Sequence, residues 1–298
     1  MKKDLLSILD VSVSEMDRLF RLSDELEGSK KKPLEGKALA LLFEKASTRT
    51  RVSFESAMLR LGGHSIYLES KTMQMSRGET LGDTAKVLSS YVDIIAARMY
   101  KQSDLEELGK AASIPVINAL TDLEHPCQAL SDVYTIRQLM DPRGRKLAFV
   151  GDIAANTANS LMVAAAMAGM EVNLVGPKNC KPNMEYVKAA GKHADVSIFS
   201  NQKEGLDGAD VVYTDTFISM GQEEEAGKRR KLFKDYQVNR KLMSYAGEKA
   251  VVMHCLPAHR GEEISAEVLD GRQSVVWQQA RNKMAVEKAI LLALSNQA

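Results

Sequence analysis

Leu39-Ala-Leu-Leu-Phe-Glu-Lys-Ala-Ser-Thr-Arg-Thr-Arg51 is the stretch of sequence that decides the fold of this chain. Its first five residues form a short apolar run of the kind found in buried β-strands, and charged and hydroxyl residues follow at once. A helix-like pattern continues over residues 52–61 and ends at the glycine pair 62–63. The stretch therefore predicts a β-strand that runs directly into an α-helix.

The same alternation of strand-like and helix-like segments recurs on both sides of this stretch. The predicted strands are 38–43, 64–68, 93–99, 114–118, 146–151, 171–175, 196–199, 210–213, 250–254 and 274–277. Helical patterns between them include 52–61, 81–91, 128–140 and 157–168. Alternation of this kind is typical of parallel sheets covered by helices on both faces, so it predicts an α/β fold.

The length of the chain predicts two domains. It has 298 residues, whereas single hydrophobic cores stop growing at roughly 250–300 residues. The segment Asp-Pro-Arg-Gly-Arg at 141–145 breaks a long helix and precedes a new strand, so it is the expected linker. We therefore expect domains at 1–140 and 141–280. A last helix, 281–295, follows the final strand, and its own pattern leaves open which domain it packs against.

The charge balance excludes several classes of function. The chain carries 40 Lys+Arg against 39 Asp+Glu, a formal net charge of +1, whereas nucleic-acid and membrane-surface binding usually needs a basic excess. No apolar run approaches the ~18 residues of a transmembrane helix. The start contains four acidic residues and is typical of an amphipathic helix after Ser12 or Ser14, not of a signal peptide. Three scattered cysteines do not form a disulfide framework, so we expect a cytoplasmic protein.

The strand–helix junction of the opening stretch predicts an anion site. Ser47 or Thr48 would cap the helix, so that unsatisfied backbone N–H groups and hydroxyls point at the same place. The helix dipole and Arg49 add positive charge there, which suits phosphate. The alternative is a well-capped helix with exposed arginines, but two arginines beside S-T at such a junction favour phosphate binding.

Two further motifs lie where strands end. In the segment 122–132, Pro126 suits the first turn of a helix, which places His125 at the helix mouth and Gln128 one turn in. His125 and Cys127 have the types of zinc ligands, but no second pair follows at zinc-like spacing. In the segment 251–261, Cys255 lies at the carboxyl end of a predicted strand. It is either a buried structural thiol or a contact for a substrate amine.

The second half supplies a different kind of polar group. The strand–turn–helix at 149–160 lacks the G-x-G-x-x-G pattern, so a dinucleotide site is not expected, although Asn156 lies at its mouth. Asp215 ends another strand and is placed to receive a cationic ligand. The charged run 222–231 that follows is either a solvated helix or a mobile lid.

Taken together, these motifs resemble the aspartate/ornithine carbamoyltransferase family over essentially the whole chain. The motifs, in the family's order, are S-T-R-T-R with F-E, H-P-C-Q-A-L, D-T-x-x-S-M-G and H-C-L-P. The cysteines in two of these motifs, with D-T-x-x-S-M-G, are similar to the ornithine branch. The resemblance implies two doubly wound parallel-sheet domains with an active-site cleft between them. It also implies transfer of the carbamoyl group of carbamoyl phosphate to the side-chain amine of L-ornithine, giving L-citrulline and phosphate in arginine metabolism.

The resemblance also implies site residues and an assembly. Carbamoyl phosphate would be bound by Ser47, Thr48, Arg49, Thr50, Gln74, Arg98, His125, Gln128 and Lys283. Ornithine would be bound by Asn156, Asp215, Ser219, Met220, Cys255 and Leu256. Arg98, His125 and Cys255 would be catalytic. A homotrimer, or a multiple of it, would form with Gln74 reaching in from the neighbouring subunit, and helix 281–298 would pack back on the first domain. No metal and no cofactor is expected, because phosphate is already a good leaving group.

One departure from the family pattern concerns the last helix. It usually opens A-E-N-R, but residues 280–283 here read A-R-N-K. Lys283 takes the place of the arginine and keeps its charge but not its planar fork. Arg281 would point about 160° around the helix from Lys283. Phe217, where tryptophan is common, is a milder change. Two other functions stay open: carbamoyl transfer to another amine (aspartate, putrescine or an acylated ornithine) and a non-catalytic binding protein.

Overall fold

The computed structural model describes residues 2–218 and 223–295, and the chain divides into two compact units. Unit 1 contains Met1–Tyr134 and Asn282–Ala298, and unit 2 contains Thr135–Arg281. The division falls inside two helices, α5 (Pro126–Leu139) and α12 (Val276–Ser295). The expected linker at 141–145 therefore lies within unit 2.

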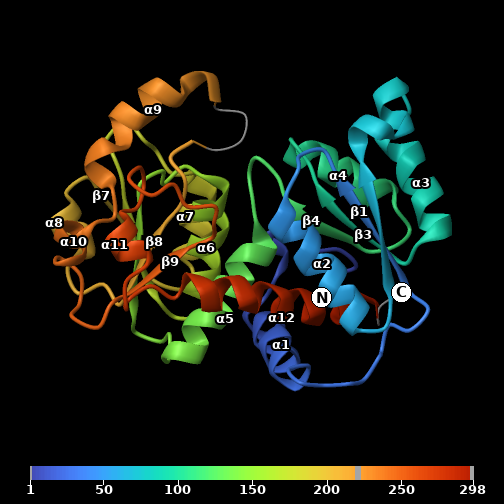
Figure 1. Cartoon of the computed structure of the whole chain (residues 1–298), viewed down its shortest axis with the longest axis horizontal. Coiled ribbons are helices and arrows are strands. Elements are labelled where there is room, and N and C mark those ends of the chain that lie inside the picture. The colour runs from blue at the N-terminus through green and yellow to red at the C-terminus, as the bar shows by residue number, and fades with distance from the viewer. Residues whose placement is uncertain (1, 219–222, 296–298) are drawn as a thin grey trace. The chain divides into compact units, whose positions relative to one another are not determined.

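Unit 1 is built on a four-stranded parallel sheet (Figure 1). Its strands, in the spatial order β2-β1-β3-β4, are β2 (His64–Glu69), β1 (Ala38–Phe43), β3 (Ile94–Arg98) and β4 (Val116–Leu120). Every residue of β1, β3 and β4 is buried, whereas the edge strand β2 is exposed or half-buried. Continuous apolar runs are what a parallel strand covered on both faces requires.

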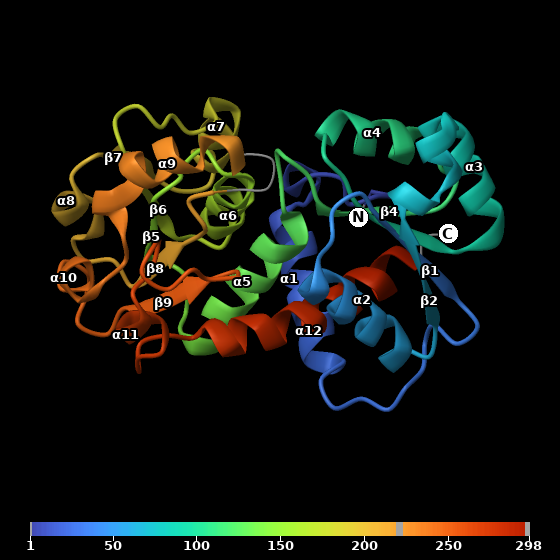
Figure 2. The same cartoon turned by 45° about the horizontal axis from the view of Figure 1, so that its top comes forward.

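Helices cover both faces of this sheet. They are α1 (Val13–Glu25), α2 (Thr48–Arg60), α3 (Leu81–Tyr91) and α4 (Gln102–Ala111), with three short helices, η1 (Ile8–Asp10), η2 (Ser70–Thr72) and η3 (Gln74–Arg77). One apolar core joins α3 and α4 to β1, β3 and β4. The connection from β1 to β2 runs toward one edge of the sheet, and the connections from β2 to β3 and from β3 to β4 run the other way. Because such crossovers are right-handed, α2 lies on one face of the sheet and α3 and α4 lie on the other. Figure 2 shows α2 on the other side of the sheet from α3 and α4.

Unit 2 is built on a five-stranded parallel sheet. Its strands, in the spatial order β7-β6-β5-β8-β9, are β7 (Val196–Phe199), β6 (Glu171–Val175), β5 (Lys146–Val150), β8 (Val211–Thr214) and β9 (Val251–His254). Its helices are α6 (Asn156–Met167), α7 (Met184–Ala190), α8 (Gln202–Leu206), α9 (Ala226–Phe233), α10 (Arg240–Met243) and α11 (Ala266–Leu269), with the short η4 (Glu223–Glu225) and η5 (Lys234–Tyr236). The charged run after Asp215 is thus largely helical, as η4 and α9.

Each sheet has one point where the strand order reverses. In unit 1 this point lies between β1 and β3, where Phe43 pairs with Arg98. In unit 2 it lies between β5 and β8, where Val150 pairs with Thr214. Open α/β sheets bind ligands outside the carboxyl ends of their strands at such a point. The topology therefore positions one candidate site on each unit.

Two parallel-sheet α/β units confirm the predicted fold class, but one predicted strand is wrong. Residues 274–277 form no strand: Ser274 makes an isolated bridge to Val252, and α12 begins at Val276. The apolar run Val-Val-Trp has a strand-like composition, yet its last two residues, Val276 and Trp277, begin a helix that starts five residues earlier than predicted. The N-terminal helix begins after Ser12, whose hydroxyl and the Glu15 carboxylate form a capping box.

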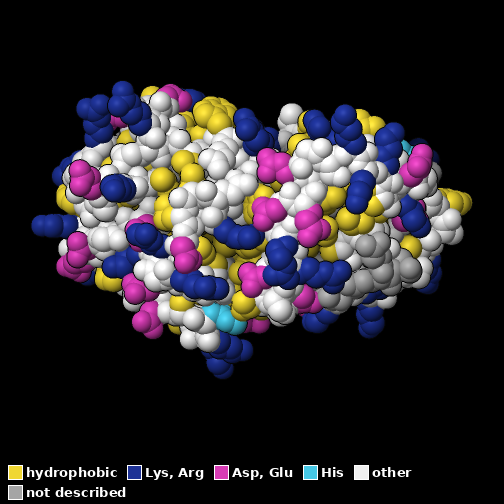
Figure 3. All heavy atoms as spheres, turned by 90° about the horizontal axis from the view of Figure 1, so that it is seen from below, with side chains coloured by type: hydrophobic (Ala, Val, Ile, Leu, Met, Phe, Trp, Pro, Cys, Tyr) yellow, Lys and Arg dark blue, Asp and Glu magenta, His cyan; other side chains and the backbone are white. Residues whose placement is uncertain are grey.

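The surface matches the near-neutral charge balance. Figure 3 shows Lys and Arg side chains interspersed with Asp and Glu side chains across the face in view. Among the described residues, no helix combines the length and the apolar character needed to cross a bilayer.

Candidate active site

The start of α2 forms the first part of a site on unit 1. Ser47 is the N-cap, with extended backbone (φ −155°, ψ 109°), and its hydroxyl accepts a hydrogen bond from the Thr50 N–H (3.4 Å). Thr48 is exposed at the same junction. The first-turn N–H groups and the positive end of the helix dipole therefore point beyond the end of β1.

The two arginines of this junction have different surroundings. Arg51 donates to Glu55 (2.9 Å), and its guanidinium lies 3.7 Å from the centre of the Tyr67 ring. Arg49 is exposed and has no ion pair within the described part of the chain. Arg49 is therefore the arginine of this pair that is available to an anion.

Two more cations lie at the reversal point of the sheet. Arg98 is the last residue of β3, and its side chain is almost fully buried (6% exposed). Its carbonyl accepts from the N–H of Glu44, which ties it to the end of β1 (2.9 Å). The ammonium group of Lys45 lies 4.2 Å from the centre of the Tyr100 ring.

The first turn of α5 adds two polar side chains. His125 precedes Pro126, and both His125 and Gln128 are buried. Burial holds the pKa of His125 well below its ordinary value, and the charges of Lys283 and Arg98 lower it further. The imidazole is therefore neutral at physiological pH. The side-chain NH2 group of Gln128 donates to Asp132 (2.8 Å), and this hydrogen bond orients the side-chain oxygen of Gln128 away from Asp132.

Lys283 on α12 joins α2 to α5. Its ammonium lies 3.3 Å from the hydroxyl of Thr50 and 3.2 Å from the side-chain oxygen of Gln128, and it is 7% exposed. Arg281 is exposed. The structure thus places Lys283, not Arg281, among the predicted anion ligands. We call this set the anion cradle; it consists of Ser47, Thr48, Arg49, Thr50, Arg98, His125, Gln128 and Lys283.

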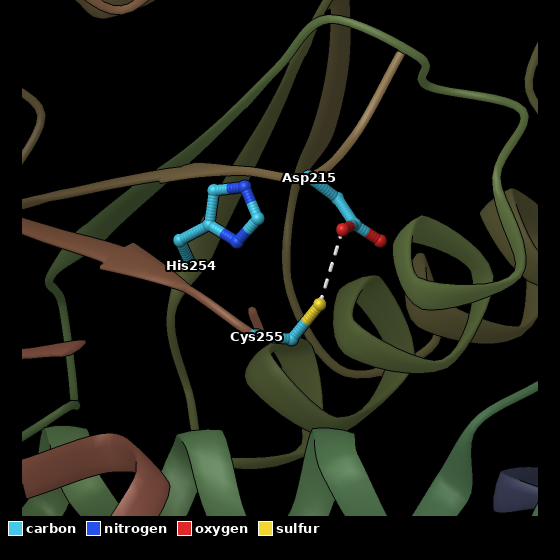
Figure 4. A group of neighbouring side chains, drawn as sticks. All are labelled: Asp215, His254 and Cys255. Carbon is cyan, nitrogen blue, oxygen red and sulfur yellow. Dashed lines mark hydrogen bonds between the residues drawn. The ribbon is translucent and has the colours of Figure 1, made fainter. Parts of the chain in front are cut away.

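A second cluster lies at the reversal point of unit 2 (Figure 4). Asp215 follows β8 and is buried, and its carboxylate accepts hydrogen bonds from the Thr157 hydroxyl (2.7 Å) and the Cys255 thiol (3.1 Å). Cys255 directly follows β9, and Asn156 begins α6. We call this set the amine cluster; it consists of Asn156, Thr157, Asp215, Cys255 and Leu256. A carboxylate beside a thiol and an amide suits an ammonium or amine ligand.

The loop after β9 is held in a strained conformation. Leu256 has φ 60°, in the left-handed region that leucine rarely adopts. Its N–H donates to His254 Nδ1 (2.9 Å), and this ring in turn contacts Glu263 through Nε2 (3.1 Å). Strain of this kind is concentrated at functional sites, where the surrounding structure enforces it.

Three side chains of this region have the types of metal ligands. Ligand atoms of Asp215, His254 and Cys255 all lie within 4.8 Å of one another. However, His254 Nδ1 accepts from the backbone. Burial favours a neutral Glu263, but the His254 hydrogen bond lowers its pKa overall, so the charged carboxylate receives the proton of Nε2. His254 thus has no lone pair left for an ion. The Cys127 thiol donates to the Asn118 carbonyl (3.4 Å), and burial raises its pKa, so it is a structural thiol.

Some predicted residues are not brought into either set. Gln74 lies on η3 with an exposed side chain that makes no hydrogen bond within the described part of the chain. Ser219 and Met220 lie outside the described residues. Sequence reasoning missed Asp132 and Thr157. Their signals were a carboxylate one helical turn after Gln128 and a hydroxyl in the first turn of α6.

Comparison with known proteins identifies the relatives of this chain. The family described as aspartate/ornithine carbamoyltransferase, carbamoyl-P binding domain, matches residues 3–138, and its Asp/Orn binding domain matches residues 143–294. The chain is 48% identical to the ornithine carbamoyltransferase of Oceanobacillus iheyensis, over 98% of this chain and 94% of that protein. It is also 48% identical to the one from Methanobrevibacter smithii, over 97% and 98%.

Solved structures agree with these relatives. The ornithine carbamoyltransferase of Pyrococcus furiosus superimposes with a TM-score of 0.92 at 44% identity, over 97% of this chain and 95% of that chain. The anabolic ornithine carbamoyltransferase of Campylobacter jejuni superimposes with a TM-score of 0.94 at 39% identity, over 99% of both chains.

Proposed function

The chain belongs to the aspartate/ornithine carbamoyltransferase family, and we propose that each of its two residue sets holds one substrate of the family's ornithine reaction. In that reaction the chain transfers the carbamoyl group of carbamoyl phosphate to the side-chain amine of L-ornithine, giving L-citrulline and phosphate. The observation that carries the assignment is the anion cradle. It gathers a helix N-terminus, two arginines and a lysine in the unit that matches the carbamoyl-phosphate-binding domain.

Carbamoyl phosphate binds in the anion cradle. The N–H groups of the first turn of α2, with Ser47, Thr48 and Arg49, hold its phosphate, because backbone donors and the helix dipole favour a dianion. Arg98, His125 and Thr50 polarise the carbamoyl carbonyl and stabilise the oxyanion that forms there. A neutral His125 acts as a hydrogen-bond donor in this role, which its lowered pKa supports. Gln128 and Lys283 complete the set.

Ornithine binds in the amine cluster. Asp215 forms an ion pair with the α-ammonium of ornithine, and Asn156 binds the end of the substrate that carries the α-amino and α-carboxylate groups. Cys255 contacts the attacking side-chain amine, and Leu256 lines the reaction centre. Ser219 and Met220 are assigned to ornithine by the family motif D-T-x-x-S-M-G alone.

Carbamoyl transfer proceeds by direct attack of the amine on the carbonyl carbon. The amine has an ordinary pKa near ~10.4 and must be neutral to attack, so exclusion of water assists the reaction. Attack forms the C–N bond and a tetrahedral oxyanion. Collapse of this intermediate breaks the C–O bond to phosphate, whose growing charge Arg49 and the helix N-terminus neutralise, and the proton lost by the attacking nitrogen passes to the departing phosphate. No metal or organic cofactor takes part, so dialysis against a chelator leaves the rate unchanged.

A panel of amines tests the substrate. With carbamoyl phosphate saturating, ornithine should be carbamoylated at least about 100-fold faster, in kcat/KM, than putrescine, N-acetylornithine or aspartate, because buried polar groups left unpaired by an analogue discriminate strongly. Comparable rates with another amine would reassign the substrate. No turnover with any amine, from protein that still binds phosphate, would support a non-catalytic binding protein.

We further propose a cytoplasmic homotrimer, or a multiple of it, in which Gln74 completes the cradle of the neighbouring subunit. The exposed side chain of Gln74 on η3 and three cysteines outside any disulfide support these assignments. Light scattering measures the subunit count. Mixed trimers of Gln74→Ala and Arg98→Ala subunits should recover part of the activity that each variant lacks alone. No recovery, despite subunit exchange, would contradict contribution across the interface.

A further inference from the structure

A buried carboxyl lies directly behind the anion cradle. Glu287 follows Lys283 by four residues on α12, so the two side chains lie on one face of this helix, one turn apart. Glu287 is fully buried (0% exposed), and within the described chain neither of its carboxylate oxygens makes a well-formed hydrogen bond; the Ser53 hydroxyl is its one weak hydrogen-bonding neighbour. A buried carboxylate in this situation is strongly disfavoured, whereas a neutral carboxyl group is tolerated.

The groups coupled to Glu287 come from three helices. The Lys283 charge on α12 and the Ser53 hydroxyl on α2 lower the pKa of Glu287, and the Glu287 charge in turn raises the pKa of the Cys127 thiol on α5. The Ser53 hydroxyl donates to the Thr50 carbonyl (3.2 Å) and the Cys127 thiol to a backbone carbonyl, so neither offers Glu287 a strong partner. Lys283 is the one formal charge in this set.

The two turns of α12 match two turns of its neighbours. Lys283 contacts Thr50 and Gln128. One turn further on, Glu287 is coupled to Ser53, one turn after Thr50, and to Cys127, next to Gln128. Glu287 thus belongs to the same helix packing that positions the cradle, but it does not touch the anion site itself.

We propose that Glu287 is a positioning residue whose proton sets how much of the Lys283 charge the anion cradle presents to carbamoyl phosphate. This proposal rests on the proposed function of the cradle. When Glu287 is neutral, the Lys283 ammonium stays hydrogen-bonded to Thr50 and Gln128, and no neighbouring negative charge reduces its attraction for the phosphate. With Glu287 ionised, an opposite charge one turn away offsets that charge and attracts the flexible lysine away from the cradle.

The pKa of Glu287 lies in a pH range in which binding constants can be measured. Burial raises its pKa to about 8, against the opposing effect of the Lys283 charge. A bound phosphate dianion disfavours a second negative charge nearby, so it further favours the neutral form. By linkage, phosphate binding above this pKa takes up a proton, and deprotonation of Glu287 weakens phosphate binding by the same factor.

The test compares the unmodified protein with Glu287→Gln, a neutral side chain of the same shape. The dissociation constant of inorganic phosphate is measured calorimetrically, and the KM of carbamoyl phosphate is measured at saturating ornithine. Between about pH 7 and about pH 9 both constants should rise about fivefold more in the parent than in the variant, the lower end of usual coupling between sites. Equal pH dependence in the two proteins would overturn the proposal.

Lys283→Arg separates the two titratable groups of this pair. A guanidinium keeps its charge throughout this pH range, so a pH dependence that comes from the Lys283 amine itself would vanish in Lys283→Arg and persist in Glu287→Gln. That pattern would also overturn the proposal. The expected pattern is the reverse, with the pH dependence retained in Lys283→Arg.

The unmodified protein gives a second readout in case Glu287→Gln fails to fold. At about pH 9 inorganic phosphate is already a dianion, so proton uptake on its binding belongs to the protein. Titrations in buffers of different ionisation enthalpy should show this uptake in the parent and in Lys283→Arg, and its absence from both would contradict the proposal. Phosphate binding without citrulline formation at about pH 7 would instead count against the proposed function alone.

Discussion

Single side chains in both residue sets are held in place by neighbours that take no part in the reaction. Asp132 orients the amide of Gln128, and Thr157 donates to the carboxylate of Asp215. In the same way, Glu55 and Tyr67 occupy Arg51 and so distinguish it from Arg49. The chemistry of the site therefore depends on hydrogen bonds one residue removed from the substrates.

Thr157→Val tests this support on the ornithine side. The change removes the hydroxyl that donates to Asp215 (2.7 Å) but keeps the shape of the side chain. We expect the KM of ornithine to rise about tenfold, in line with the loss of one hydrogen bond to a charged group. The KM of carbamoyl phosphate should not change. Thr157→Ser, which retains the hydroxyl, is the matched control, and an equal effect of both variants would show that the hydroxyl is irrelevant.

The protonation state of His125 is a second prediction at this scale. Because burial and two neighbouring cations lower its pKa well below the ordinary value, the ring stays neutral as the pH falls from about 8 to about 6. Proton NMR of the ring should show no titration of His125 over this range. A His125 resonance that shifts with a midpoint near neutrality would mean that the imidazolium form polarises the carbonyl.

Within each unit, the elements of the fold bring these side chains to one edge of the sheet, because helices begin where strands end. The α2 start, the end of β3 and the α5 start meet at the reversal point of one sheet, and the ends of β8 and β9 meet at that of the other. The helix α12 then brings Lys283 onto α2 and α5. Its position explains how a lysine distant in sequence joins the cradle.

Glu287 on α12 predicts a pH dependence of stability. Its pKa is raised to about 8, so the folded protein holds a proton that the unfolded chain, with an ordinary pKa of 4.5, releases. The free energy of unfolding therefore falls as the pH rises from 4.5 to about 8, and it levels off above that pH. In Glu287→Gln this fall should be smaller by about 3 to 4 kcal/mol, measured by urea unfolding at about pH 5 and about pH 8. A fall of the same size in both proteins would contradict a buried neutral carboxyl.

Much of this arrangement was predictable from the sequence, for physical reasons. Continuous apolar runs predict buried strands, and the motifs S-T-R-T-R and H-C-L-P come directly after two of these runs. The sequence therefore places their polar groups at the carboxyl ends of strands. The sequence assigned Arg49 to the anion site through the family motif, but it could not show why Arg51 is unavailable, because that depends on the contacts of Arg51 with Glu55 and Tyr67. The run at 274–277 was predicted as a strand because Val-Val-Trp favours strands locally, whereas in the structure Ser274 makes only an isolated bridge and α12 begins at Val276. Glu287 gave no signal, because one acidic residue among apolar neighbours on a helix is ordinary until its burial is known.

At the scale of the whole molecule, the chain consists of two compact units of similar construction, each with a parallel sheet and one reversal point. The unit with the anion cradle matches the carbamoyl-phosphate-binding family domain, and the unit with the amine cluster lies within the match to the aspartate/ornithine-binding domain. The proposed function thus assigns two substrates of opposite charge to one unit each. The near-neutral net charge of +1 conceals this separation, since the positive cluster on one unit is balanced elsewhere.

The assignment of one substrate to each unit is tested most directly by measuring both KM values in Arg49→Ala and Asp215→Asn, with Arg51→Ala as the matched control. We predict a crossed pattern. Arg49→Ala should raise the KM of carbamoyl phosphate at least about tenfold, and Asp215→Asn should raise that of ornithine by as much, each leaving the other substrate within about twofold. Arg51→Ala should change neither value by more than about twofold, because its side chain is occupied by Glu55 and Tyr67. If both variants weakened the two substrates equally, or if Arg49→Ala left carbamoyl phosphate unaffected, the assignment would be wrong.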